Sequence, residues 1–224
     1  MNRLTETVKH LLIVNVLFFI ATSLYGDRMY EWFALWFPKN EYFEIWQVVT
    51  HMFMHGGFSH IAFNMFALWM FGGPVEQYLG RNRFLFLYFS AGFGAALFQV
   101  AFYYFNYLPG YGELLDSGLA ADQIVQMLST NSGIPGLSQE QLYYLKDIIP
   151  IFNSTMVGAS GCIMGILAAF GVMSPNAELM LIFFPVPIKA KYFIPGSLIL
   201  LNVVPLFTGT PILGPSNTAY MAHI

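Results

Sequence analysis

The ten residues Met156–Gly165 read MVGASGCIMG, and the interpretation of the whole chain turns on them. Nearly all of these side chains are small, although the stretch lies within an apolar run. Gly161 and Gly165 form a GxxxG pattern, which in membranes allows two helices to pack closely. Ser160 therefore has two interpretations, as a member of a packing face or as a nucleophile. The rest of the sequence has to decide between them.

The composition indicates a membrane protein. Of the 224 residues, 57% are hydrophobic and only 9% are charged, whereas a soluble domain carries about 25% charged residues. The mean hydropathy is +0.59. The net charge of −3 and the scattered basic residues give no indication of nucleic-acid binding. The single cysteine, Cys162, allows no intrachain disulfide and is expected to be a small packing residue.

Five apolar segments approach the roughly 20 residues that span a bilayer. They cover residues 8–25, 61–80, 84–107, 152–173 and 192–207. The segments at 26–60 and 108–151 connect them and are called loop one and loop three below. The expected fold class is an all-α polytopic membrane protein in which residues 1–224 form a single domain. Within loop three, Ser138 and Gln141 have the spacing of a capping box and predict a short helix.

The basic residues predict the orientation in the membrane. With a cytoplasmic N-terminus, most of them fall on the cytoplasmic side, and the positive-inside rule favours this arrangement. They are Arg3, Lys9, Arg81, Arg83, Lys189 and Lys191. Loop one and loop three then lie outside. Loop one is rich in aromatic residues and is expected to lie partly in the membrane interface.

Histidine and asparagine side chains near the second apolar segment need an explanation, because polar groups are costly in a bilayer. His60 and Asn64 share a helix face and can both donate hydrogen bonds, which suits an oxyanion site or a link between two helices. His51 and His55 have the spacing of two metal ligands. Glycines break the helix before His60, however, and no carboxylate or cysteine is near. We therefore expect structural hydrogen bonds from His51 and His55, and no metal.

Glu76 and Ser160 complete the set of candidate residues. Glu76 lies close to Arg81 and Arg83 in the sequence, so it is expected to be an anchor or an ion-pair partner. It is too far along its helix from His60 to share a site. Ser160 is a weak nucleophile unless a base takes its proton, and histidine is the natural base near neutral pH. In the expected topology Ser160, His60 and His223 all lie toward the outer leaflet, with Ser160 several residues inside its helix.

Taken together, the motifs resemble those of the rhomboid intramembrane serine proteases. The GxSG motif of that family stands here at Gly158–Gly161, and its HxxxN pair at His60–Asn64. The histidine that begins its sixth helix matches His223 within Ala-His-Ile. The stretches WQVVTHMFMH at 46–55 and GGPVEQYLGRNRF at 72–84 also look like the family. The resemblance runs from about Trp46 to the last residue.

The resemblance implies a rhomboid-like helical bundle with a six-helix core, and it implies roles for individual residues. Ser160 would attack the substrate carbonyl, with His223 as general base and then general acid. The backbone N–H of Ser160, together with His60 and Asn64, would stabilise the oxyanion. Met164 stands where the family often has an aromatic residue, so we expect a substrate-pocket or packing position there. Gly158, Gly161 and Gly165 would provide the close packing around it.

The resemblance also implies the setting of the reaction. Substrates would be transmembrane proteins, cut near the outer face of the bilayer, which in the simplest case is the inner membrane of a bacterium. No cofactor, metal, nucleotide or nucleic acid is implied. The sixth helix is truncated after Ile224, which predicts a weakly active or inactive chain. A non-proteolytic rhomboid-like protein that binds transmembrane clients is the alternative, and an unrelated transporter or channel is a further one.

Overall fold

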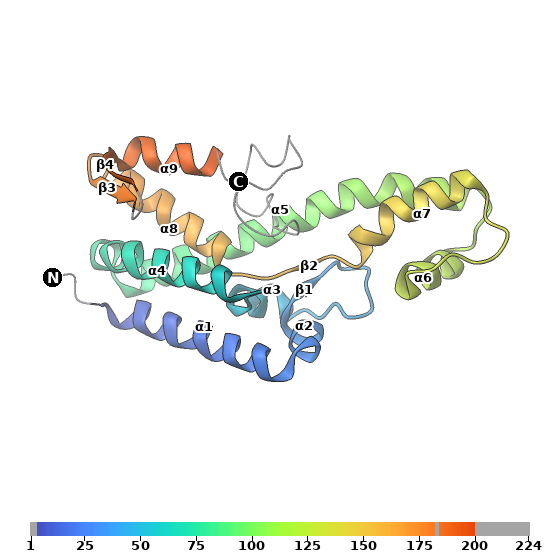
Figure 1. Ribbon diagram of the computed structural model, residues 1–224, viewed down its shortest axis with the longest axis horizontal. Helices are drawn as coiled ribbons and strands as arrows, with labels where there is room; N and C mark the ends of the chain where they lie inside the picture. Colours follow the sequence, from blue (N-terminus) through green and yellow to red (C-terminus); the bar gives the residue numbers. More distant parts are fainter. Residues whose placement is uncertain (1–3, 182–183, 200–224) are drawn as a thin grey trace.

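The computed structural model describes residues 4–181 and 184–199, and this part of the chain is mostly helical (Figure 1). His223 and the expected sixth helix lie outside the described residues. Five of the described helices form the bundle. They are α1 (Glu6–Tyr25), α4 (Phe58–Leu79), α5 (Arg81–Asp116), α8 (Ser160–Met173) and α9 (Ala190–Leu198). A hairpin of β3 (Glu178–Leu181) and β4 (Phe184–Lys189) joins α8 to α9.

The core of the bundle lies between α1, α4, α5 and α8. Its fully buried side chains come from all four helices and include Val8, Leu68, Phe84, Tyr88 and Ile166. Among the described helices, α1 and α5 are long and apolar enough to cross a membrane by length and composition, and α8 is a shorter apolar helix. Many large apolar side chains on the outside of the bundle remain exposed, as expected for a protein whose outer surface meets lipid.

Glycines bring α5 and α8 close together. A Cβ atom added at Gly92 of α5 would lie 2.6 Å from Cys162 Sγ and 2.7 Å from Met52 Sδ. A Cβ added at Gly165 of α8 would collide with the Cβ of Ala91. The small residues of α8 therefore face α5, and the missing side chains allow the two backbones to approach.

The structure corrects two of the expected spans. The third, expected at 84–107, continues to Asp116, which makes α5 36 residues long. At a rise of 1.5 Å per residue this is about 54 Å, well beyond the roughly 30 Å thickness of a hydrocarbon core. The fourth, expected at 152–173, begins only at Ser160. Residues 153–159 are not helical because β2 (Thr155–Met156) pairs with a strand of loop one and Gly158 has a φ of +130°.

Loop three folds into a helical lobe. We call residues 103–152 the lobe. The lobe consists of the second half of α5, α6 (Ala121–Thr130) and α7 (Gln139–Phe152). The predicted capping box is confirmed, since the Ser138 side chain accepts from Gln141 N and the Gln141 side chain from Ser138 N. The lobe has its own buried core, and Figure 1 shows it at the end of the molecule opposite the N-terminus.

Loop one consists of short helices and a short strand joined by irregular chain. It contains α2 (Asp27–Phe33), β1 (Leu35–Trp36), α3 (Gln47–Thr50) and a 3₁₀ turn, η1 (His51–Phe53). β1 pairs antiparallel with β2, with Leu35 opposite Met156 and Trp36 opposite Thr155. Loop one is therefore hydrogen-bonded to the segment that leads into Ser160.

Candidate active site

Ser160 is the first residue of α8 rather than a residue several positions inside it. Gly158 precedes it with a φ of +130°, a conformation that side-chain-bearing residues rarely adopt. The chain turns there from β2 into the helix. The Ser160 residue is mostly buried, and its backbone N–H belongs to the first turn of α8. The turn thus combines a hydroxyl with backbone donors.

Gly158 is the point at which His60 and Ser160 meet. A Cβ atom added to Gly158 would lie 2.9 Å from both Cε1 and Nε2 of His60, and 3.4 Å from Ser160 Oγ. The imidazole of α4 and the hydroxyl of α8 therefore border the same small space beside the Gly158 backbone. Any side chain at this position would fill that space. The structure thus places His60 beside Gly158 and Ser160, although the two motifs lie far apart in the sequence.

Asn64 follows His60 by one turn of α4 and is buried. Its Nδ2 atom has no hydrogen-bond partner among the described residues. Leaving a buried donor unpaired costs about 1–3 kcal/mol. A buried amide donor one helical turn from His60 is suited to a ligand that brings its own acceptor.

His51 ties loop one to the Ser160 turn through its backbone. The carbonyl oxygen of His51 accepts a hydrogen bond from Gly158 N at 2.9 Å. Its ring is fully buried, with Nδ1 2.8 Å from the carbonyl oxygen of Gln47. The His55 ring stands edge-on to the His60 ring, with their centroids 5.0 Å apart. The described residues contain no group of three or more His, Cys, Asp or Glu side chains that could hold a metal ion.

The two loop-one histidines are uncharged near neutral pH. Burial lowers the pKa of His51 to about 4, against an ordinary value of 6.5. Burial, and secondarily the neighbouring His60, lowers the pKa of His55 to about 4 as well. At pH 7 the His51 ring contributes its hydrogen bond to Gln47 O and packing, and it carries no charge. The expected hydrogen bonds from His55 are not found: neither ring nitrogen has a partner among the described residues, so this ring contributes packing against His60 alone.

Gln47 has a role that the sequence did not reveal. Its side chain is fully buried, with Nε2 donating to the carbonyl oxygens of Glu31 and Tyr42 at 3.0 and 2.8 Å. Its Oε1 accepts from the backbone N–H of Trp36 at 3.3 Å. One amide thus binds three separate stretches of loop one. Its only signal in the sequence was its place within the stretch WQVVTHMFMH at 46–55.

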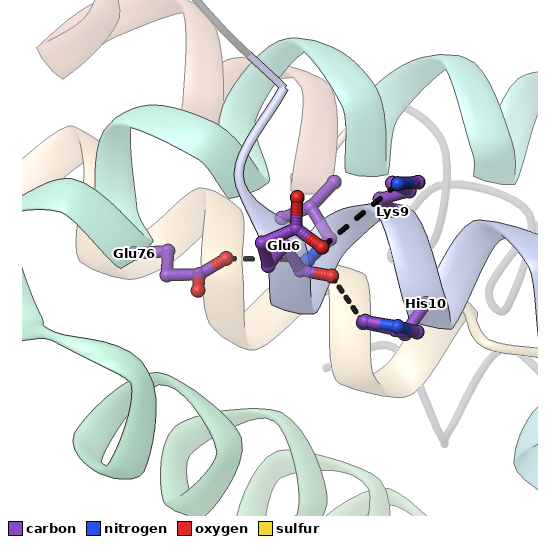
Figure 2. Close-up of polar contacts among 5 residues, drawn as sticks. Glu6, Lys9, His10 and Glu76 are labelled. Carbon is purple, nitrogen blue, oxygen red and sulfur yellow. Dashed lines mark hydrogen bonds and ion pairs between the residues drawn. The ribbon is translucent and has the colours of Figure 1, made fainter.

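Glu76 contacts the beginning of α1. Its carboxylate accepts a hydrogen bond from the hydroxyl of Thr5 and another, at 3.2 Å, from Val8 N. Figure 2 shows Glu76 reaching from α4 to the first turn of α1. Among the described side chains the only ion pair is Lys9 with Glu6, so the expected pairing of Glu76 with Arg81 or Arg83 is absent there. The reason is geometric: the carboxylate faces the free N–H groups of α1 rather than the start of α5.

The remaining candidates lie along α8 or outside the described residues. Gly161 is buried, Met164 is half-buried, and Gly165 packs on Ala91 of α5. The small-residue face of α8 thus meets α5. His223 lies outside the described residues, so its position relative to Ser160 remains a prediction from the sequence.

Comparison with known proteins identifies the family. A family model described as the Rhomboid domain matches residues 42–224. A protein named Rhomboid protease GlpG from Yersinia pseudotuberculosis serotype I (strain IP32953) is 28% identical over 180 residues, which is 71% of this chain and 60% of that protein. Proteins of the same name from Salmonella choleraesuis (strain SC-B67) and Salmonella newport (strain SL254) are 41% and 40% identical over 75 residues, which is 33% of this chain and 27% of each.

The alignments cover less than two thirds of the length of each of these relatives. The domain match, in contrast, covers most of this chain, from loop one through the Ser160 turn to the last residue. The protein is therefore a membrane protein that belongs to the rhomboid family.

Proposed function

We propose that the protein is an intramembrane serine endopeptidase that cleaves transmembrane protein substrates near the outer face of the bilayer. The observation that carries the proposal is the convergence of the His60 ring and the Ser160 hydroxyl on Gly158, at the start of α8. Membership of the rhomboid family, with relatives named rhomboid protease, supports the same reaction. Ser160 is the proposed nucleophile and His223 the proposed base.

The proposed reaction is an acyl transfer in two stages. Ser160 Oγ attacks the carbonyl carbon of the scissile peptide bond while its proton passes to His223. When the C–N bond breaks, His223 gives that proton to the leaving amine. Water then attacks the acyl-enzyme and passes a proton to His223. His223 returns this proton to Ser160 Oγ as the ester bond breaks and the new carboxyl end is released.

The oxyanion formed in each stage needs hydrogen-bond donors already in place. The proposed donors are the backbone N–H of Ser160 and the side chains of His60 and Asn64. The unpartnered Nδ2 of Asn64 supports this role, because a buried amide donor gains most from an acceptor that develops charge. Replacing one such donor typically lowers kcat by about 10²–10³.

The proposed orientation has a cytoplasmic N-terminus and a site that opens to the outside, in a bacterial inner membrane. The starts of α1 and α5 and the link from β4 to α9 carry most of the basic residues and lie at one end of the bundle (Figure 1). The lobe, which carries Glu113, Asp122, Glu140 and Asp147, lies at the other end. This asymmetry supports an outside position for the lobe.

A fluorophosphonate probe tests the proposed nucleophile. The membrane-embedded protein is labelled as wild type, as Ser160→Ala and as His223→Ala, with Ser90→Ala as a matched control. Ser90 is exposed on α5, and its hydroxyl bonds only to its own helix, at Leu87 O. We expect labelling of wild type and the control, and loss of labelling in the other two variants.

A second measurement checks cleavage itself. A reconstituted transmembrane substrate should be cut by wild type and by Ser90→Ala, and not by Ser160→Ala. Labelling that persists in Ser160→Ala would exclude Ser160 as the nucleophile. Wild type that is neither labelled nor able to cleave substrate would instead favour the client-binding alternative.

A further inference from the structure

Loop one is fastened to the lobe by a buried aromatic residue. Phe37 comes directly after β1, yet it is fully buried within the core of the lobe. Its ring centroid lies 4.8 Å from that of Tyr104 and 5.0 Å from that of Tyr107, both on the second half of α5. Burying a large aromatic side chain is a substantial favourable contribution to packing. The core of the lobe is therefore incomplete without loop one.

Two asparagines form a polar joint beside this contact. Asn40 Nδ2 donates to Phe152 O at the end of α7 at 3.0 Å, and to Asn153 Oδ1 at 3.3 Å. Asn153 Nδ2 donates in turn to Leu128 O, near the end of α6, at 2.9 Å. A pair of amides thus links loop one to the ends of both lobe helices. Breaking it takes from Phe152 O the side-chain donor that reaches it from loop one.

The joint continues directly into the Ser160 turn. Phe37 N donates to Ser154 O at 3.2 Å, and Trp36 lies opposite Thr155 in the β1–β2 pair. Two residues after β2, Gly158 N donates to His51 O. The chain between Asn153 and Ser160 is therefore held against loop one along its length.

We propose that the lobe is a clamp that holds loop one against β2 and thereby sets the position of Gly158 and Ser160. Asn40 and Asn153 are its positioning residues. They act through the β1–β2 pair, and neither touches the proposed reacting atoms. The role in catalysis rests on the proposed function. The physical reason is that a displacement of about 1 Å at a reacting group can cost about 100-fold in rate.

The first test compares asparagines in two settings. Asn40→Ala and Asn153→Ala remove the joint, whereas Asn106→Ala removes an amide of the lobe that donates only to Phe102 O within its own helix. We expect the rate constant of fluorophosphonate labelling to fall about tenfold in the first two variants and to stay at the wild-type value in the third. The double variant Asn40→Ala/Asn153→Ala should slow labelling by less than the product of the two single effects, because either single variant already removes the Asn40–Asn153 hydrogen bond.

The second test replaces the clamp by a covalent bond. Trp36 and Thr155 lie opposite each other, at a separation of about 4.5–5.5 Å that suits a disulfide. The double substitution Trp36→Cys/Thr155→Cys is made with and without Asn40→Ala. The native Cys162 is buried and does not compete. After oxidation we expect Asn40→Ala to be labelled as fast as its disulfide-bonded parent, and after reduction to be slow again.

Three results would overturn the clamp. They are wild-type labelling of Asn40→Ala, equal slowing by Asn106→Ala, and slow labelling of Asn40→Ala even with the disulfide formed. If Asn40→Ala does not fold, Asn153→Ala takes its place in the disulfide experiment. If wild type is not labelled at all, the proposed function fails. The rate of disulfide formation then tests the clamp, and equal rates with and without Asn40→Ala would refute it.

Discussion

The two halves of α5 build two different cores. The first half packs through small residues: Ala91 and Gly92 allow a close approach to α8 and η1, and Ala95 and Ala96 pack against Leu35 and Met156 of the two short strands. The second half packs on α6, α7 and Phe37 through large side chains, including Tyr107 and Leu114. The difference shows how one helix serves two purposes. Near the candidate site, small residues allow the backbones of neighbouring helices to approach closely. In the lobe, aromatic side chains fill a core that holds loop one in place.

The strongest test of the small-residue half is Gly158→Ala. The added Cβ would lie 2.9 Å from the His60 ring, at a backbone conformation that alanine rarely adopts. We expect fluorophosphonate labelling to fall by about 100-fold or more, because the space between His60 and Ser160 is filled. The rate constant of labelling measures the effect.

Gly73→Ala is the matched control for that variant. Gly73 lies inside α4, the helix of His60, and an added Cβ would meet nothing within 4 Å. Its labelling should equal that of wild type. A Gly158→Ala protein labelled at the wild-type rate would show that the space beside Gly158 has no part in the reaction.

Lowering the pH should destabilise loop one more than the lobe. The folded-state pKa values of His51 and His55 are about 4, below the ordinary value of 6.5, so the unfolded chain binds more protons between these values. Stability is therefore fully present above pH 6.5 and is lost as the pH falls toward 4. The expected loss is about 2 kcal/mol for each histidine by pH 5.

Hydrogen exchange corrected for its intrinsic pH dependence measures this effect. Exchange in loop one should rise between pH 6.5 and pH 5, and His55→Gln should reduce the pH dependence. The sequence places no histidine between residues 61 and 222, so exchange in α6 and the first turns of α7 should change less. Equal rises in loop one and α6 would mean that the two regions open as a single unit.

Overpacking each half compares them directly. Gly92→Ala would place a Cβ 2.6 Å from Cys162 Sγ, and Gly110→Ala would place one 2.6 Å from Ile148 Cγ2 in the lobe. Each should cost about 1–3 kcal/mol of unfolding free energy. We expect Gly92→Ala to lower protection from hydrogen exchange in α8, and Gly110→Ala to lower it in α7.

Gly94→Ala is the control for both variants, since an added Cβ at Gly94 meets open space. It should leave the unfolding midpoint unchanged or raise it slightly. Adding Cys162→Ala should restore part of the stability lost in Gly92→Ala, because the colliding sulfur is removed. If Gly110→Ala lowered the hydrogen-exchange protection of α8 as much as Gly92→Ala does, the two cores would not be distinct.

The smallest effect is expected at the far end of the bundle, from Glu76→Gln. The substitution removes the negative charge that faces the first turn of α1 but keeps an acceptor for Val8 N and Thr5. We expect a loss of about 1 kcal/mol, measured as a lowered midpoint of thermal unfolding. Glu6→Gln is the control, because its carboxylate is exposed and pairs with Lys9 at 3.9 Å, and it should change almost nothing. Equal shifts from both would deny Glu76 a specific role.

The sequence predicted the parts of the fold that depend on short-range patterns. Apolar runs predicted the positions of α1, α4, α5 and α8, and the majority of their ends were predicted to within a few residues. Ser138 with Gln141 predicted the start of α7. It missed the extension of α5 to Asp116 and the start of α8 at Ser160. Hydropathy cannot reveal these ends. The first is set by packing within the lobe, and the second by pairing of β2 with a strand more than a hundred residues earlier.

For the candidate site, the sequence by itself determined which residue types are present and at what spacing. It singled out Ser160, His60, Asn64 and Gly158, and through them the family. Only the tertiary structure decided that the His60 ring and Ser160 both lie beside Gly158. It also decided that Glu76 faces α1, and that Gln47 and Asn40 hold loop one in place. The reason is physical. Helical spacing fixes neighbours within a few residues, whereas hydrogen bonds between distant segments depend on how all the helices pack.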